Sequence, residues 1–204
     1  MRKRTMRCLA MFLALVMVFT VLPLTAMAET TAGVRAELVT DASQLKAGDQ
    51  IVIAAKDSEM ALGTNQKSNN REAVAVTKTG TTLSGGDDVQ VLTLEAGTKE
   101  GTFAFYAGTS GYLYAAGQTK AQSGNKSNQN YLRTDKELTD NASWKISITS
   151  GAASIVAQGK NGCNTLRYNS GSSKLFSCYA SGQQDVAIYR KVLRRRRRRA
   201  ARLC

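Results

Sequence analysis

Residues 143–157 read Ser-Trp-Lys-Ile-Ser-Ile-Thr-Ser-Gly-Ala-Ala-Ser-Ile-Val-Ala, and this stretch indicates the fold class. Trp144, Ile146 and Ile148 alternate with polar residues, which places them on one face of an extended strand. A second short apolar run, Ser154–Ala157, follows after Gly151 and two alanines. Short runs of this kind, separated by small and polar residues, are typical of β-strands.

The same pattern continues through most of the chain. Strand-like runs are separated by clusters of Gly, Asn, Ser, Asp and Lys, and after the N-terminal apolar segment no stretch of ten residues keeps a helical period. We therefore predict an all-β domain over residues 37–192, with strands near Gln50–Ala55, Ala73–Lys78, Val89–Glu95, Thr102–Tyr106, Gly111–Ala115, Tyr131–Thr134, Ser143–Thr149, Ser154–Ala157, Thr165–Tyr168, Lys174–Tyr179 and Asp185–Arg190.

These runs group into three units of about fifty residues. The opening strands of the units start near residues 50, 102 and 153, and each unit closes on a longer alternating strand. Three four-stranded units predict a β-trefoil-like closed barrel, which leaves no exposed sheet edge. A two-sheet β-sandwich of the same strands is the alternative.

Both ends of the chain differ from this body. Residues 1–28 have a basic start, an apolar run and the sequence Ala26-Met27-Ala28, which predicts a signal peptide cleaved after Ala28 rather than a membrane anchor. The mature protein is then secreted, extracellular or attached to a cell surface, where disulfides can form. Residues 29–36 resemble a flexible lead, and residues 193–204 form an Arg-rich tail that is predicted to be disordered.

The net charge of +13 comes mainly from these ends. Of 28 basic residues, four precede residue 29 and seven follow residue 193, so 17 basic residues accompany all 15 acidic ones in between. The body is nearly neutral. Because the sequence has no histidine, catalytic sites that use Ser-His-Asp or Cys-His and metal sites with His ligands are excluded.

Two cysteines flank the turn signal Asn169-Ser-Gly-Ser-Ser173. A hairpin about this turn would place Cys163 and Cys178 opposite each other, within disulfide range. Two buried free thiols are the alternative.

The residue types that remain suit a noncatalytic carbohydrate site, in which an aromatic ring stacks on a sugar and amides bond its hydroxyls. Equally, the tyrosines could be half-buried strand residues and the amides turn formers. No catalytic residue, metal ligand set or cofactor motif is predicted, and Asp135, Glu137 and Asp140 are expected in one solvated loop. The candidate carbohydrate-binding residues are Tyr112, Tyr114, Asn130, Tyr131, Asn164, Tyr168, Asn169, Gln183 and Gln184.

Three segments near the end of the body carry a resemblance: Leu166-Arg-Tyr-Asn169, Leu175-Phe-Ser-Cys-Tyr179 and Gln184-Asp-Val-Ala-Ile-Tyr-Arg-Lys191. They are similar to the end of an accessory domain of secreted multidomain proteins of anaerobic gut bacteria. Ala47-Gly-Asp-Gln-Ile-Val-Ile53 and the later Trp144-Lys-Ile146 resemble the beginning and middle of that domain, so the resemblance covers residues 37–191. It implies a module attached to nucleases, phosphoesterases or glycosidases, with no catalytic residue of its own. The Gln-x-Trp repeat of ricin-type lectins is absent from the matching strands, which read Val89-Gln-Val, Ser143-Trp and Asp185-Val.

The sequence therefore predicts a secreted, noncatalytic binding module for carbohydrate or a glycoconjugate at a cell or mucosal surface. One alternative is an accessory or structural fragment of a larger secreted hydrolase. Another is binding of polyanions or a membrane by the tail arginines Arg194, Arg195, Arg196, Arg197, Arg198 and Arg199, unless this tail is an extension from a truncated or shifted reading frame.

Overall fold

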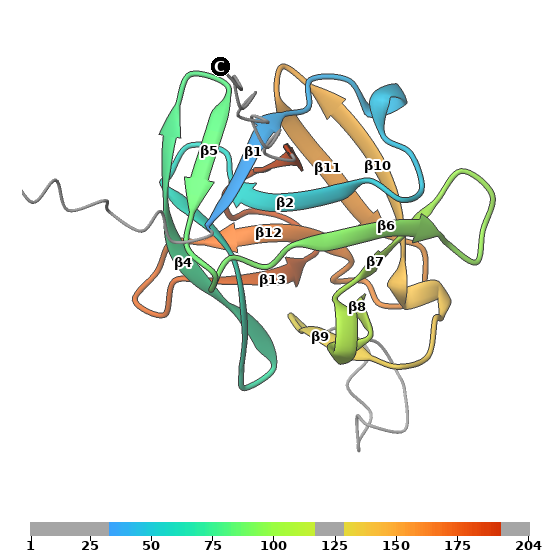
Figure 1. The fold of residues 1–204 in the computed structure, drawn as a ribbon. Coiled ribbons are helices and arrows are strands. Elements are labelled where there is room, and N and C mark those ends of the chain that lie inside the picture. Colours follow the sequence, from blue (N-terminus) through green and yellow to red (C-terminus); the bar gives the residue numbers. More distant parts are fainter. Residues whose placement is uncertain (1–32, 117–128, 193–204) are drawn as a thin grey trace, which may run out of the picture. The chain divides into compact units, whose positions relative to one another are not determined.

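A computed structural model gives the fold and describes residues 33–116 and 129–192. Its strands are joined by loops that include three short 3-10 turns, η1 (Ala42–Gln44), η2 (Gly108–Ser110) and η3 (Asp140–Ala142). In these two ranges, no helix has the length and apolar character needed to cross a membrane. The prediction of an all-β domain is confirmed (Figure 1). The predicted signal peptide and the Arg194–Arg199 tail lie outside the described residues.

Six strands pair antiparallel in a closed ring. In ring order they are β2 (Gln50–Ala55), β6 (Leu92–Ala96), β7 (Phe103–Tyr106), β10 (Ser143–Thr149), β11 (Ala152–Ala157) and β14 (Val186–Lys191), which pairs with β2 again. Three of the junctions, β2–β6, β7–β10 and β11–β14, are only one or two residue pairs long. The ring is therefore closed but irregular.

Each predicted unit adds one hairpin to this ring. The hairpins are β3 (Met60–Lys67) with β4 (Asn70–Thr79), β8 (Tyr112–Ala115) with β9 (Leu132–Asp135), and β12 (Thr165–Asn169) with β13 (Leu175–Tyr179). Because β2, β7 and β11 open the three units near the predicted positions, the β-trefoil-like fold is confirmed and the two-sheet sandwich is not formed.

The main core lies inside the ring. Trp144 is fully buried, stacks on Phe105 with ring centroids 5.5 Å apart, and donates its indole N–H to the Leu113 carbonyl at 3.0 Å. Ile51 and Ile188 enter the same cluster from β2 and β14. Side chains alternate along a strand, so the residues between these inward positions face outward.

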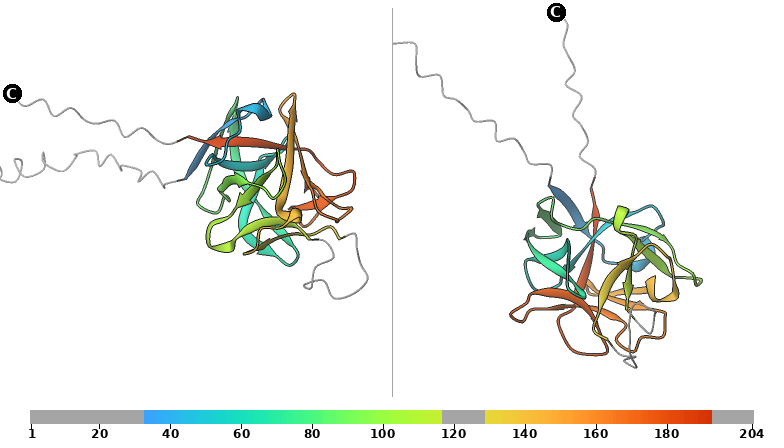
Figure 2. Two further views of the ribbon diagram at one scale, coloured as in Figure 1. Left: turned by 90° about the vertical axis from the view of Figure 1, so that its right-hand side faces the viewer. Right: turned by 90° about the horizontal axis from the view of Figure 1, so that it is seen from below.

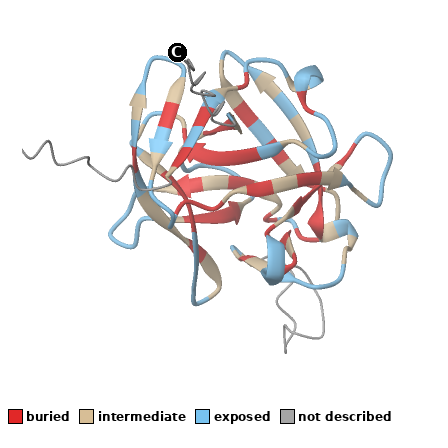
Figure 3. Cartoon of the chain, viewed as in Figure 1, coloured by how far each residue is buried: buried red, intermediate tan, exposed pale blue. Residues whose placement is uncertain are grey.

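Two further strands, β1 (Val34–Leu38) and β5 (Thr82–Gly85), cover one outer side of the ring. β1 pairs with β14 and β5, and β5 also pairs with the end of β4 (Figure 2). A second apolar cluster forms beneath them and contains Ala36, Val52 and Tyr189. Figure 3 shows β2 coloured as buried along most of its length. The predicted lead 29–36 is thus wrong from Val34 onward, because Val34 and Ala36 are buried strand residues.

The predicted pairing of Cys163 with Cys178 is wrong. Cys178 lies opposite Leu166, because the β12–β13 hairpin closes over residues 170–174, further along the chain than the sequence indicated. Both cysteines are free and buried, in agreement with the alternative interpretation. Burial, together with the nearby Cys163, raises the pKa of Cys178 well above its ordinary value.

Candidate functional site

A row of polar and aromatic side chains crosses the outer face of five neighbouring strands. Gln50 of β2 pairs with Thr93 of β6, Thr93 with Tyr106 of β7, Tyr106 with Tyr112 of β8, and Tyr112 with Asp135 of β9. Directly opposed residues of antiparallel strands project from the same face with Cβ atoms about 5 Å apart. We call these five residues the aromatic row.

The aromatic row faces solvent because its neighbours along each strand face the core. Gln50 and Asp135 are exposed, and the three residues between them are partly exposed. The adjacent inward residues are Ile51, Leu92, Leu94, Phe105 and Leu113, all fully buried.

The two rings at the centre of the aromatic row are held in place. The Tyr106 and Tyr112 ring centroids lie 5.4 Å apart, with the rings tilted by 53°. The Tyr112 hydroxyl donates a 2.9 Å hydrogen bond to Glu95 Oε2, and this bond is the main reason that the pKa of Tyr112 is raised. Tyr112 therefore remains a protonated donor, and Glu95 fixes its ring.

This arrangement has the chemistry needed for a sugar. Aromatic rings offer apolar surface to the C–H groups of a pyranose, and their orientation requires little side-chain ordering on binding. The carboxylates of Glu95 and Asp135 accept hydrogen bonds from hydroxyls, and the Gln50 amide both donates and accepts.

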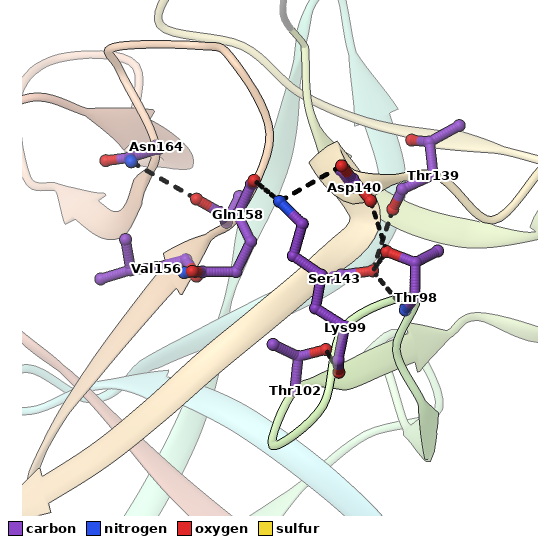
Figure 4. Close-up of polar contacts among 10 residues, drawn as sticks. Thr98, Lys99, Thr102, Thr139, Asp140, Ser143, Val156, Gln158 and Asn164 are labelled. Atoms are coloured by element: carbon purple, nitrogen blue, oxygen red, sulfur yellow. Dashed lines mark hydrogen bonds and ion pairs between the residues drawn. The ribbon is translucent and has the colours of Figure 1, made fainter.

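A second feature is a cavity of about 480 Å³ between the β6–β7 loop, η3 and the β11–β12 loop. We call it the polar pocket, and Figure 4 shows its hydrogen bonds. It is lined by Lys99, Thr139, Asp140, Asn141, Gln158, Gly159 and Lys160.

The loops around the polar pocket are fixed by hydrogen bonds to buried side chains. Ser143 Oγ accepts from the Thr98 backbone N–H at 2.9 Å and donates to the Thr139 carbonyl at 3.0 Å. Thr102 Oγ1 donates to the Lys99 carbonyl at 2.5 Å. Since Ser143 and Thr102 are buried, the β6–β7 loop and η3 are held together before any ligand arrives.

One ion pair lies in the polar pocket. Lys99 Nζ is 3.2 Å from Asp140 Oδ2 and donates to the Gln158 carbonyl at 2.7 Å. The Thr98 hydroxyl donates to the other Asp140 oxygen at 2.6 Å. The Thr98 hydrogen bond, with support from Lys99, lowers the pKa of Asp140, so this carboxylate is charged at neutral pH, with one partner on each oxygen.

The structure packs the predicted Tyr112 and Tyr131 against the buried Tyr114 and places Tyr168 apart from them. Tyr112 lies in the aromatic row, and Tyr131 is partly covered by the Arg133 guanidinium, 5.2 Å from its ring centroid. Tyr114 and Tyr168 are 5% and 2% exposed. The prediction is wrong for these two rings, because Tyr114 packs in a small cluster under η3 and Tyr168 lies in the main core.

The predicted amides are also spread over the surface, and several have partners within the protein. Asn164 donates to the Ala157 carbonyl at 3.3 Å, and Asn169 donates to the Tyr179 hydroxyl at 2.9 Å. The Gln184 side-chain oxygen accepts from Ser58 at 3.0 Å. The other two, Asn130 and Gln183, are exposed. The structure does not bring these amides together with Tyr112.

Sequence reasoning missed Tyr106, Glu95 and Gln50. Each was inside a predicted strand. For Glu95 the sequence contained a signal, because Thr93 and Glu95 alternate with Leu92 and Leu94 and so face the solvent side of their strand. Their proximity depends on the register of β6 with β7, of β7 with β8, and of β6 with β2, which lies more than forty residues earlier, and the sequence pattern does not specify these registers.

No known protein-family model matches the sequence, and no curated protein matches it. Among solved structures, the chain is similar to the BEL β-trefoil (12% identity, 72% of this chain and 95% of that chain, TM-score 0.51). It is also similar to a GlcNAcα1-4Gal-releasing endo-β-galactosidase from Clostridium perfringens (10% identity, 70% of this chain and 32% of that chain, TM-score 0.50). A third similar structure is SeviL bound to the asialo-GM1 saccharide (10% identity, 69% of this chain and 96% of that chain, TM-score 0.48). At these identities the similarity shows the fold alone, which is that of a β-trefoil.

Proposed function

We propose that this protein is a secreted, noncatalytic binding module that binds a carbohydrate on the aromatic row. The observation that carries the proposal is the continuous register from Gln50 through Tyr106 and Tyr112 to Asp135, which collects two accessible rings and polar groups on one outer face. Hydrophobic contact with the rings supplies affinity, and hydrogen bonds to the polar groups supply orientation.

The test combines a glycan array with calorimetry on the strongest ligand. Replacing Tyr106 or Tyr112 by Ala removes the ring surface, and we expect binding to weaken at least tenfold, or about 1.4 kcal/mol. Tyr112→Phe keeps the ring and loses only the bond to Glu95, so it retains most of the affinity. Tyr179→Ala is the matched control, because Tyr179 is a partly exposed strand tyrosine outside the aromatic row.

Two outcomes would refute the proposal. One is the absence of binding to any glycan, which would favour the predicted alternative of an accessory fragment of a larger secreted hydrolase. The other is binding that the Tyr106 and Tyr112 variants leave unchanged. If such binding disappears at high salt, the tail Arg194–Arg199 becomes the candidate, because binding of polyanions by arginine runs depends strongly on salt.

A further inference from the structure

We infer that the polar pocket is a second binding site, separate from the aromatic row, and that it takes a sugar carrying a carboxylate or a sulfate. The inference rests on the balance of charges and hydrogen-bonding groups in the pocket lining, and it stands independently of the proposed function.

The pocket lining offers charged donors to a ligand, whereas its one carboxylate is already engaged. Each Asp140 oxygen has a partner, Lys99 on one and Thr98 on the other. The Lys99 ammonium has three N–H donors, and the Asp140 carboxylate and the Gln158 carbonyl use two of them. Lys160 is exposed and has no hydrogen-bond or ion-pair partner among residues 33–116 and 129–192. The charged donors that remain free therefore belong to the two ammonium groups.

The lining residues also carry a net positive charge. Lys99 and Asp140 neutralise each other as an ion pair, which leaves the charge of Lys160. An anionic group that enters the pocket meets two cations and one carboxylate whose charge is already compensated. Hydrogen bonds between ammonium groups and anionic oxygens are stronger than those between neutral groups.

The size of the pocket favours a sugar over a bare anion. A volume of about 480 Å³ lies in the range of small-molecule sites and exceeds the space that a single carboxylate or sulfate needs. The remaining lining supplies partners for hydroxyls, because the Gln158 side-chain oxygen has no hydrogen bond to the described residues, whereas its amide N–H bonds the Val156 carbonyl. The hydrogen-bonded loops make the pocket preformed, which lowers the entropic cost of binding.

The experiment uses two charge changes with opposite expected effects. Lys160→Gln removes the unpaired ammonium, and we expect about tenfold weaker binding of the acidic sugar. Asp140→Asn keeps an acceptor for Thr98 but frees Lys99 from its counter-charge, and we expect binding to tighten about threefold, as Coulomb's law gives for one charge at roughly 6 Å in water. A merely structural role for Asp140 would not tighten binding.

Lys145→Gln is the matched control, because Lys145 is an exposed lysine in β10 outside the pocket lining. It removes the same charge from the protein and leaves the arginine tail unchanged. The readout is the chemical shift of the Gly159 and Lys160 backbone amides during titration of the ¹⁵N-labelled protein. The probes are glucuronic acid, N-acetylneuraminic acid, glucose 6-sulfate and, as the neutral comparison, glucose.

The inference is supported if an acidic sugar causes saturable chemical-shift changes and glucose does not, and if Lys160→Gln weakens this binding while Lys145→Gln does not. Comparison of the carboxylated and sulfated probes shows which anion is preferred. Equal shifts with glucose, no shifts at Gly159, or equal effects of the two lysine variants overturn it. Tyr112→Ala leaves these shifts unchanged, so a failure of the polar pocket and a failure of the aromatic row are distinguishable.

Discussion

Replacing Arg71 with methionine tests how a buried guanidinium without a carboxylate partner stabilises the first unit. Arg71 is 1% exposed, and its Nη2 donates to the Gly63 carbonyl at 3.0 Å, the Thr64 carbonyl at 2.7 Å and the Gln90 side-chain oxygen at 2.7 Å. The ion pairs of the described residues do not include Arg71. Burial lowers its pKa, since the charged form loses solvation.

The expected loss follows from the acceptors that remain. Methionine fills similar space but leaves the buried Gly63 and Gln90 oxygens without a donor, at a cost of about 1.5 kcal/mol each. The Thr64 carbonyl is partly exposed and regains water. We therefore expect the free energy of unfolding to fall by about 3 kcal/mol, which is roughly a 150-fold change in the unfolding equilibrium constant.

A double-mutant cycle separates this effect from simple loss of volume. The double variant, Arg71→Met with Gln90→Met, no longer contains the Gln90 oxygen that Arg71→Met leaves without a donor. Its loss of unfolding free energy is therefore about 1.5 kcal/mol smaller than the sum of the losses in the two single variants. Urea unfolding followed by the fluorescence of Trp144, the only tryptophan, gives all four values. The exposed Arg35→Met is the control and changes stability by less than about 0.5 kcal/mol. A loss below about 1 kcal/mol in Arg71→Met, or strict additivity with Gln90→Met, would refute the reasoning.

Three further predictions concern stability. Trp144→Phe loses the indole hydrogen bond to Leu113 and opens a cavity, and circular dichroism during urea unfolding will show a loss of about 2–3 kcal/mol. Because burial raises the pKa of Cys178, the unfolded thiol ionises first as the pH rises past its ordinary value of 9.0. The free energy of unfolding then falls between pH 8 and 10 by about 1 kcal/mol more in the native protein than in Cys178→Ala. The same dependence of unfolding free energy on pH in both proteins would contradict this. Gly111→Ala forces a side chain into a left-handed conformation (φ 90°) where its Cβ overlaps the Asp135 carbonyl, and we expect a loss of about 3 kcal/mol. Gly80→Ala is the control, because Gly80 also has a positive φ but its Cβ would meet open space, and we expect a loss of only about 1 kcal/mol. Equal decreases of the melting temperature in the two variants would show that the overlap with the Asp135 carbonyl is relieved.

Much of the ring could be predicted from the sequence, because its strands are short apolar or alternating runs separated by turn-forming residues. The strand β3 was missed for the opposite reason: its second half, Thr64–Lys67, is polar and exposed on both sides, and it contains no apolar repeat. β1 was missed because its two buried residues, Val34 and Ala36, become buried only through pairing with β5 and β14. Such burial depends on distant strands and leaves little local signal.

The candidate site was predicted by residue type and not by position. Tyrosines are amphipathic, and both a core position such as Tyr168 and a surface position such as Tyr112 suit them. The sequence alone could not separate these two, because each lies in a short strand of β-forming residues. Three-dimensional register was needed to join Tyr112 to Tyr106 and Glu95.

The extension formed by β1 and β5 explains why Tyr189 is buried while Tyr106 of the aromatic row stays partly exposed. Tyr189 of β14 also faces away from the main core, yet it is buried, because β1 pairs along β14 and Lys78 of β4 lies 5.9 Å from its ring centroid. On β7 and β8 no described strand covers the outer face, and Tyr106 and Tyr112 remain partly exposed. Among the ring strands, tyrosine is therefore buried on β14, where the extension reaches it, and partly exposed on β7, where the extension does not reach, which leaves Tyr106 available for the ligand contact that we propose for the aromatic row.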